Sequence, residues 1–192
     1  MPEPLHEHAL EHLRYIRDTM ERASAFTAVP GWGGVLMGAT ALAAAPLAGP
    51  PRESARWIAV WIADAVVAAA IGLVAIALKA QRTGAPLAAG PAQRFALAYV
   101  PPLAVGAVLT LVFASHGLIV RLPGCWLLTY GAATTTGGAL SVRVVPIMGL
   151  AFMLLGIAAF IAPAAWGHVF MALGFGGLHI GFGIVIARNY GG

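Results

Sequence analysis

Long apolar stretches separated by short polar or proline-containing segments form the main pattern along the chain. A helix that crosses a bilayer needs about 20 mostly apolar residues. Breaks at Pro50-Pro51, at 84–91 and at Pro163 divide the apolar sequence, and the first and fifth windows are short. The pattern predicts an all-α, polytopic membrane helix bundle with six transmembrane helices, at residues 31–48, 55–78, 95–115, 122–141, 144–162 and 167–187.

The segment before the first window has a different periodicity. Apolar residues recur there at every third or fourth position, which places them on one face of a helix: Leu5, Ala9, Leu13, Ile16 and Met20. We expect an amphipathic helix over 4–24, lying on the membrane surface or against the cytoplasmic ends of the spans. The chain therefore divides into an interfacial helix, 1–28, and a transmembrane domain, 29–192.

Composition and charge support a membrane protein and add an orientation. The chain is 60% hydrophobic and 9% charged, whereas soluble domains have about 25% charged residues, so a soluble globular enzyme is excluded. Six spans would place most of the basic residues on the side of the termini, which predicts that both termini are cytoplasmic. The excess positive charge favours anionic lipid, and no nucleic-acid partner is expected. Tryptophans near the window starts predict an interfacial belt: Trp32, Trp57, Trp126 and Trp166.

Acidic residues are few, and they end early in the chain. The seventh and last is Asp64, so 65–192 contain no carboxylate side chain. Asp64 falls near the middle of the second window, where an ionisable residue is a candidate functional group. The alternative is a protonated carboxyl group that is hydrogen-bonded to another helix. Both interpretations stay open from the residues alone.

The other ionisable group expected to be embedded in the membrane, away from the ends of a window, is His179, which lies in a glycine-rich stretch. It is interpreted as an interior histidine or a partner of Asp64, with a haem ligand as the weaker alternative. The Gly-x-x-x-Gly pairs Gly177/Gly181 and Gly34/Gly38 predict close helix contacts. In the fourth window Tyr130 and Thr134 share a helix face with Thr129 at its edge, and Pro101-Pro102 predict a kink in the third. The predicted ligand-binding residues are Asp64, His179, Thr129, Tyr130 and Thr134.

The N-terminal segment contains the weak metal candidates His8, Glu11 and His12. Their spacing fits the His-x-x-Glu-His pattern of inverted zinc peptidases. A catalytic zinc needs a third protein ligand, and no acid follows Asp64. A solvated polar face is the favoured interpretation. No cofactor is predicted, the single Cys125 excludes an intrachain disulfide, and no catalytic residue is assigned, so a non-enzyme is favoured over an enzyme.

Two weak internal matches suggest a duplication. Pro30-Gly31 with Gly38-Ala39 matches Pro123-Gly124 with Gly131-Ala132, which pairs windows one and four as an inverted three-plus-three repeat would. A rival match pairs windows two and six in parallel. The two schemes conflict, and the residues do not decide between them.

The stretch from Phe26 to Gly34, Phe-Thr-Ala-Val-Pro-Gly-Trp-Gly-Gly, and the earlier Leu13-Arg-Tyr-Ile-Arg17 resemble a family of six-span bacterial inner-membrane proteins. The family has no assigned activity, so the resemblance implies a location and adds no catalytic residue.

Three functions remain as hypotheses. The first is a transporter or ligand-binding membrane protein for a small molecule or ion, with a polar site at the midplane. The second is a non-catalytic membrane subunit or sensor whose N-terminal helix contacts a cytoplasmic partner. The third and weakest is a haem or quinone electron carrier. The lipid bilayer is the expected partner in each, and a homo-oligomer is a further candidate assembly.

Overall fold

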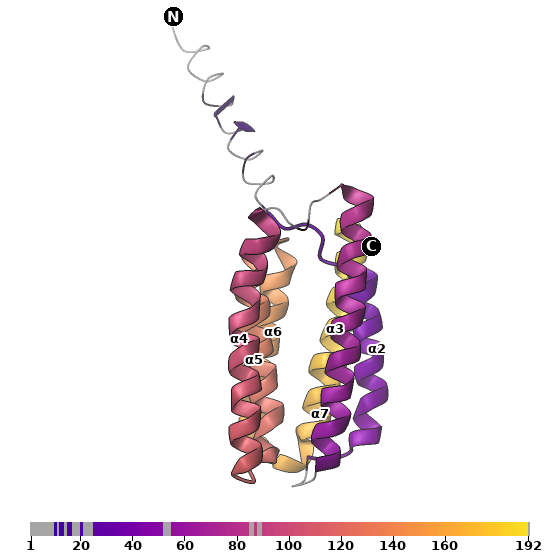
Figure 1. Ribbon diagram of the computed structural model, residues 1–192, viewed down its shortest axis with the longest axis vertical. Helices are drawn as coiled ribbons and strands as arrows, with labels where there is room; N and C mark the ends of the chain where they lie inside the picture. Colours follow the sequence, from indigo (N-terminus) through magenta and orange to yellow (C-terminus); the bar gives the residue numbers. More distant parts are fainter. Residues whose placement is uncertain are drawn as a thin grey trace, which may run out of the picture.

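The computed structural model describes residues 10, 12, 13, 15, 16, 20, 25–51, 55–84, 87 and 90–191. In this part of the chain the fold is all-α (Figure 1). The long helices lie side by side along the longest axis of the molecule. They are α2 (Gly31–Ala48), α3 (Ala55–Thr83), α4 (Gly90–Ser115), α5 (Leu122–Gly138), α6 (Val144–Ile161) and a last helical run made of α7 (Gly167–Met171), the π-helix η3 (Ala172–Leu178) and α8 (His179–Tyr190).

Five helical segments in the described ranges are long and apolar enough to cross a membrane: α2, α3, α4, α6 and the run Ala164–Tyr190. They make the chain compatible with an integral membrane protein. The helix at the fourth predicted span, α5, is not among them, because it has 17 residues and ends at Gly138, at the lower limit of about 17 for a span. A 3-10 turn, η1 (Ile119–Arg121), precedes it. The six-span count therefore stays a prediction.

The described part of the N-terminal segment is helical where it was predicted to be. Most of the predicted helix, 4–24, lies outside the described residues. The described positions are helical and exposed: Leu10, His12, Leu13, Tyr15, Ile16 and Met20.

The helices form two groups, each built around one helix. In the first group α2 packs between α3 and α8, and in the second α5 packs between α4 and α6 (Figure 1). The chain passes along α2 and α5 in opposite directions. An inverted three-plus-three repeat produces this contact pattern, because the first helix then packs against the second and sixth, and the fourth against the fifth and third.

Glycines allow α5 and α6 to approach each other to backbone contact. A Cβ atom at Gly131 would lie 2.7 Å from the carbonyl oxygen of Gly149 and 2.8 Å from the amide nitrogen of Met153. A similar approach occurs at Gly138 on α5, where a Cβ atom would lie 2.8 Å from the backbone nitrogen of Pro146, and Gly124 makes room for the ring of Phe160. Side chains at these positions would push the helices apart, so the pair depends on their absence.

The first group contains a similar contact between α2 and the last helical run. A Cβ atom at Gly38 would lie 2.7 Å from the carbonyl oxygen of Gly176, so the predicted contact of the Gly34/Gly38 pair is present. The predicted close helix contact at the other pair, Gly177/Gly181, is wrong. A Cβ atom at Gly181 would have no neighbour within 4 Å, and one at Gly177 would have only a carbonyl oxygen at 4.0 Å. The contact face of this run instead carries Gly174, Gly176 and Gly183.

The prolines of α4 do not interrupt the helix, which continues through Pro101 and Pro102. Pro102 has no N–H group to donate to the carbonyl oxygen of Ala98. The hydroxyl group of Thr136 on α5 donates to this oxygen instead, at 2.7 Å. The freed carbonyl group is therefore used to join α4 and α5.

One end of the bundle, which we call the Lys79 end, is crossed by the segment Phe26–Val29. The amide of Phe26 donates to the carbonyl oxygen of Leu140 at 2.8 Å, and the hydroxyl of Ser141 donates to the carbonyl oxygen of Phe26 at 2.6 Å. At the other end of the segment, the buried ammonium group of Lys79 donates to the carbonyl oxygen of Val29 at 2.9 Å. The segment is thus hydrogen-bonded to both helix groups.

Lys79 also holds the end of α8. Its ammonium group donates to the carbonyl oxygens of Tyr190 and Gly191, at 2.9 and 2.5 Å. An ammonium group has three N–H donors, and all of them have carbonyl partners here. A cation at a helix C-terminus also interacts favourably with the helix dipole.

Tryptophans close the opposite end, the Trp57 end, and this corrects the prediction of an interfacial belt. Trp57 is 1% exposed and stacks on Trp126 with ring centroids 5.3 Å apart. Trp61 is also buried, with its ring centroid 6.3 Å from that of Trp57. Only Trp32 and Trp166 are exposed as interface anchors would be. A tryptophan near a helix end can pack against another group of helices instead of facing the membrane interface. Trp57 on α3 does so by stacking on Trp126 of α5.

We predict that Gly131→Ala lowers stability while the matched Gly181→Ala does not. The first substitution places a methyl group against the backbone of α6, and forcing helices apart costs about 1 to 3 kcal/mol. The second occupies open space and gains helix propensity. Thermal unfolding of the two proteins in detergent measures the difference. Equal melting temperatures would show that the close approach does not stabilise the bundle.

Candidate functional site

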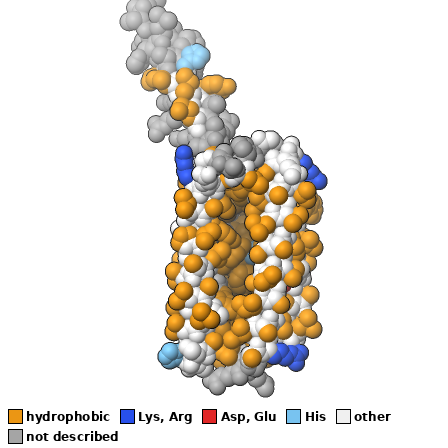
Figure 2. Space-filling model, viewed as in Figure 1, with side chains coloured by type: hydrophobic (Ala, Val, Ile, Leu, Met, Phe, Trp, Pro, Cys, Tyr) orange, Lys and Arg blue, Asp and Glu red, His pale blue; other side chains and the backbone are white. Residues whose placement is uncertain are grey.

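A cavity of about 590 Å³ lies between the two helix groups. Residues of α2, α3 and α8 line one wall, and residues of α4, α5 and α6 line the other. Figure 2 shows the cavity as a hollow that opens sideways between the two groups, where orange hydrophobic side chains surround it. All five predicted ligand-binding residues line it: Asp64, Thr129, Tyr130, Thr134 and His179.

The shape of the cavity follows from the packing around it. The segment Phe26–Val29 crosses the Lys79 end, and the cluster of Trp57 and Trp61 packs at the Trp57 end. Within the described ranges, α3 packs mainly against α2, and α4 mainly against α5. The side between α3 and α4 is therefore the open one, and in a bilayer it faces lipid.

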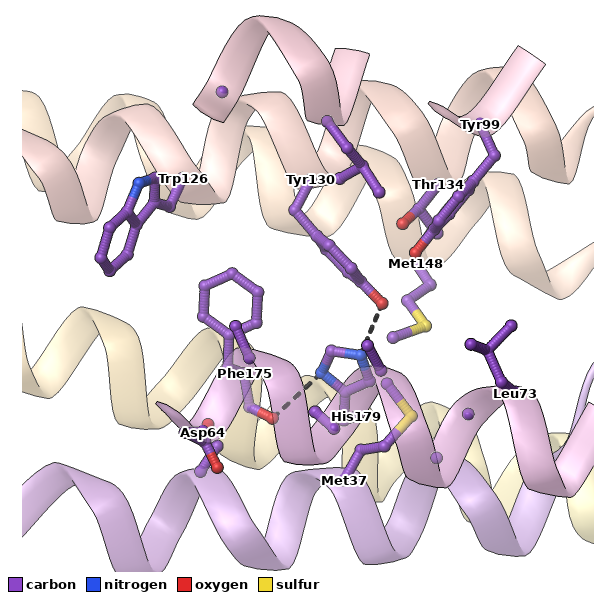
Figure 3. Close-up of a pocket in the computed structure, with 18 of the residues that line it drawn as sticks. Met37, Asp64, Leu73, Tyr99, Trp126, Tyr130, Thr134, Met148, Phe175 and His179 are labelled. Atoms are coloured by element: carbon purple, nitrogen blue, oxygen red, sulfur yellow. Dashed lines mark hydrogen bonds between the residues drawn. The ribbon is translucent and has the colours of Figure 1, made fainter. Parts of the chain in front are cut away.

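A hydrogen bond between Tyr130 and His179 crosses the cavity from one helix group to the other. The Tyr130 hydroxyl lies 2.7 Å from Nε2 of His179 (Figure 3). Nδ1 of the same ring lies 3.0 Å from the carbonyl oxygen of Phe175, which can only accept. Nδ1 therefore carries the proton in a neutral imidazole ring, and the Tyr130 hydroxyl donates to Nε2. His179 is 4% exposed, so this pair satisfies a buried polar ring.

The π-helix explains why the ring of His179 bonds to Phe175. η3 ends at Leu178, and the amide of His179 donates to the carbonyl oxygen of Gly176. In an α-helix that amide would donate to Phe175. Here the imidazole Nδ1–H makes the bond to Phe175 instead. π-helical segments occur often at functional sites, and this one sets the orientation of the only histidine in the cavity lining.

Thr134 differs from the threonines around it. Thr129, Thr135 and Thr136 each donate to the carbonyl oxygen four residues earlier in α5, as threonines in helices commonly do. The hydroxyl of Thr134 is buried near the phenol groups of Tyr99 and Tyr130, but it makes no well-aligned hydrogen bond within the described structure. The hydroxyl oxygen is enclosed by protein atoms, so it belongs to the packed wall of the cavity.

Asp64 lies on α3, on the same side of the cavity as His179. In Figure 3 it lies on one side of the cavity, while Tyr130, Thr134 and Trp126 occupy the opposite wall. Its carboxyl group is partly exposed and has the hydroxyl of Thr40 on α2 as a neighbour. The structure therefore places Asp64 and His179 in one cavity. It does not pair them directly, because the nitrogens of His179 bond to Tyr130 and Phe175.

The metal and haem hypotheses gain no support from the geometry. His8 and Glu11 lie outside the described residues, and His12 is exposed. Among the residues that the structure describes, no three His, Cys, Asp or Glu side chains form a metal-binding group. A haem iron at His179 would have to replace Tyr130 at Nε2.

Sequence reasoning missed the aromatic part of the lining. Trp61 precedes Asp64 by three residues and Phe175 precedes His179 by four, so each shares a helix face with a predicted residue. Tyr99 gives a weaker signal, because only the packing of α4 on α5 brings it to Thr134. Six aromatic side chains line the cavity: Trp61, Phe95, Tyr99, Trp126, Tyr130 and Phe175.

Comparison with known proteins gives no relative from which a role can be transferred. No family model matches the chain, and no curated protein or solved structure matches it at a significant level. The functional argument therefore depends on the geometry of the cavity.

We predict that Tyr130→Phe and His179→Phe are not additive in their effect on stability. Each single substitution leaves a buried polar group without its partner, at about 1 to 3 kcal/mol. The double variant leaves neither, so it should lose less than the two single losses together. Thermal or denaturant unfolding of the four proteins gives the coupling energy. Full additivity would show that the hydrogen bond does not join the two helix groups.

Proposed function

We propose that this chain is an integral membrane protein that binds and transports a small molecule through its central cavity. The cavity itself is the observation that carries the proposal. Its volume of about 590 Å³ falls within the range of about 300 to 1,000 Å³ for small-molecule sites. Apolar and aromatic walls with a few convergent polar groups are also typical of such sites.

The arrangement of the helices supports transport as well as binding. The cavity lies between two helix groups that contact each other mainly through α7, η3 and α8 on one side and α5 and α6 on the other. Transporters with inverted repeats commonly bind substrate between two such units and rock one against the other. Tyr130 and His179 contribute one side chain from each group, so their bond is a contact that a rocking motion would change.

The distribution of basic residues supports cytoplasmic termini in a bacterial inner membrane, with six spans of which α5 is the fourth. Arg82, Arg94, Arg143 and Arg188 lie at the Lys79 end of the bundle, where α8 also ends, whereas Arg56 and Arg121 lie at the Trp57 end. More positive residues favour the cytoplasmic side. The Lys79 end is then cytoplasmic.

A membrane subunit or sensor is the second candidate, and the exposed helical residues near the N-terminus favour it. Leu13, Ile16 and Met20 are each more than half exposed. Apolar side chains in that arrangement bind a membrane surface or a partner. This role needs no occupant in the cavity, so a test for a bound molecule also separates the two candidates.

We predict that Ala69→Trp removes a bound small molecule and that Ala70→Trp does not. Ala69 lines the cavity, whereas its neighbour Ala70 is exposed outside the lining, so both changes add the same side chain to α3. The measurement is mass spectrometry of solvent extracts from the purified full-length proteins. A molecule enriched with the wild type and Ala70→Trp, and several-fold lower with Ala69→Trp, is the expected result. Identical extracts from all three proteins would contradict ligand binding in the cavity and favour the subunit or sensor.

A further inference from the structure

The charges around the cavity limit what it can bind. Asp64 is the only Asp, Glu, Lys or Arg residue among the residues that line it. The two basic residues of α3 that flank Asp64 in sequence already have carbonyl partners: Arg56 donates to the carbonyl oxygen of Leu47, and Lys79 donates to three carbonyl oxygens. An anionic ligand would therefore meet a carboxyl group and no cationic partner, whereas a cation would find a partner of opposite charge in Asp64. Charges in a low-dielectric site interact strongly, so the sign of the ligand's charge strongly affects its binding.

The aromatic rings of the lining also favour a positively charged ligand. A cation is attracted to the face of an aromatic ring, most strongly for tryptophan, within about 6 Å of its centre. Trp61 lies one helical turn before Asp64 on α3, and Phe175 lines the same cavity. Trp126, Tyr99 and Tyr130 extend the aromatic lining along the opposite wall. The carboxyl group and the rings together form the kind of surroundings that bind organic cations.

The same lining disfavours a small hydrated cation. The carboxyl group of Asp64 and the hydroxyl of Thr40 are the polar groups gathered at this point. Metal cations such as Mg²⁺ and Ca²⁺ take about six or more oxygen ligands. A cation whose charge is shielded by apolar groups needs no such shell, and it can enter from lipid between α3 and α4.

We infer that the cavity binds a lipophilic organic monocation, which enters from the bilayer and places its charge between Asp64 and the neighbouring aromatic rings. This inference rests on the proposed ligand-binding function and adds the class of ligand.

The test uses two ions of the same shape and opposite charge, tetraphenylphosphonium and tetraphenylborate, with neutral triphenylphosphine oxide as a third probe. Binding is measured by equilibrium dialysis against the full-length protein in phosphatidylcholine nanodiscs, with empty nanodiscs subtracted. We expect saturable binding of the phosphonium ion at about one per chain. Asp64→Asn should weaken it by about tenfold or more, and Asp64→Glu, which keeps the charge, should recover part of the loss. The probe should also be lost with Ala69→Trp and kept with Ala70→Trp.

Several results would overturn the inference without overturning ligand binding. Saturable binding of tetraphenylborate, or equally tight binding of triphenylphosphine oxide, that is lost with Ala69→Trp would show a cavity that accepts anions or neutral molecules such as quinones. Unchanged phosphonium binding by Asp64→Asn would show that the carboxyl group does not recognise the charge. The comparison of the three probes on the wild type needs no variant, so it decides the question even if Asp64→Asn fails to fold. Absence of phosphonium binding would also reject the inference, while the extracts from Ala69→Trp and Ala70→Trp decide the proposed function separately.

Discussion

Close backbone contact between paired helices is the constraint on which the rest of this structure depends. In lipid there is no hydrophobic force that drives helices together, so association depends on close packing and hydrogen bonds. Gly131 and Gly149 let α5 and α6 approach to backbone contact, and Gly38 and Gly176 do the same for α2 and the last helical run. Each group is tight because its helices lack side chains at these points. The space that is left lies between the groups, and it forms the cavity.

Two polar side chains of the bundle bond to carbonyl groups in ways that regular helices would not provide. Pro102 leaves the carbonyl group of Ala98 for Thr136, and the π-helix leaves that of Phe175 for His179. In both cases a local departure from the α-helical pattern supplies a hydrogen-bond acceptor inside an apolar bundle. Buried polar groups need such partners. His179 lines the cavity, so one of these irregularities positions a residue of the site, whereas the bond of the exposed Thr136 joins α4 to α5.

Much of the fold follows from the sequence, and less of the site does. Apolar windows predict where helices lie, because length and hydropathy are local properties. Asp64, Tyr130 and His179 were predicted from being polar within such windows, and the structure brings them to one cavity. The helix partners were not predictable in this way. Gly181 and Gly183 look alike in sequence, and only packing decides that Gly183 meets α2. The burial of Trp57 likewise depends on how the helices pack, which the local sequence does not show.

The segment Phe26–Val29 has a mechanical consequence for the molecule. Leu140 and Ser141 hold one end of it on the second helix group, and Lys79 holds the other end on the first. A change in the angle between the groups would stretch or release this tie. A force on the chain before Phe26 would in turn reach both groups together. A pull on the N-terminal residues could therefore alter the angle between the two groups, and with it the width of the cavity, although these residues do not line it.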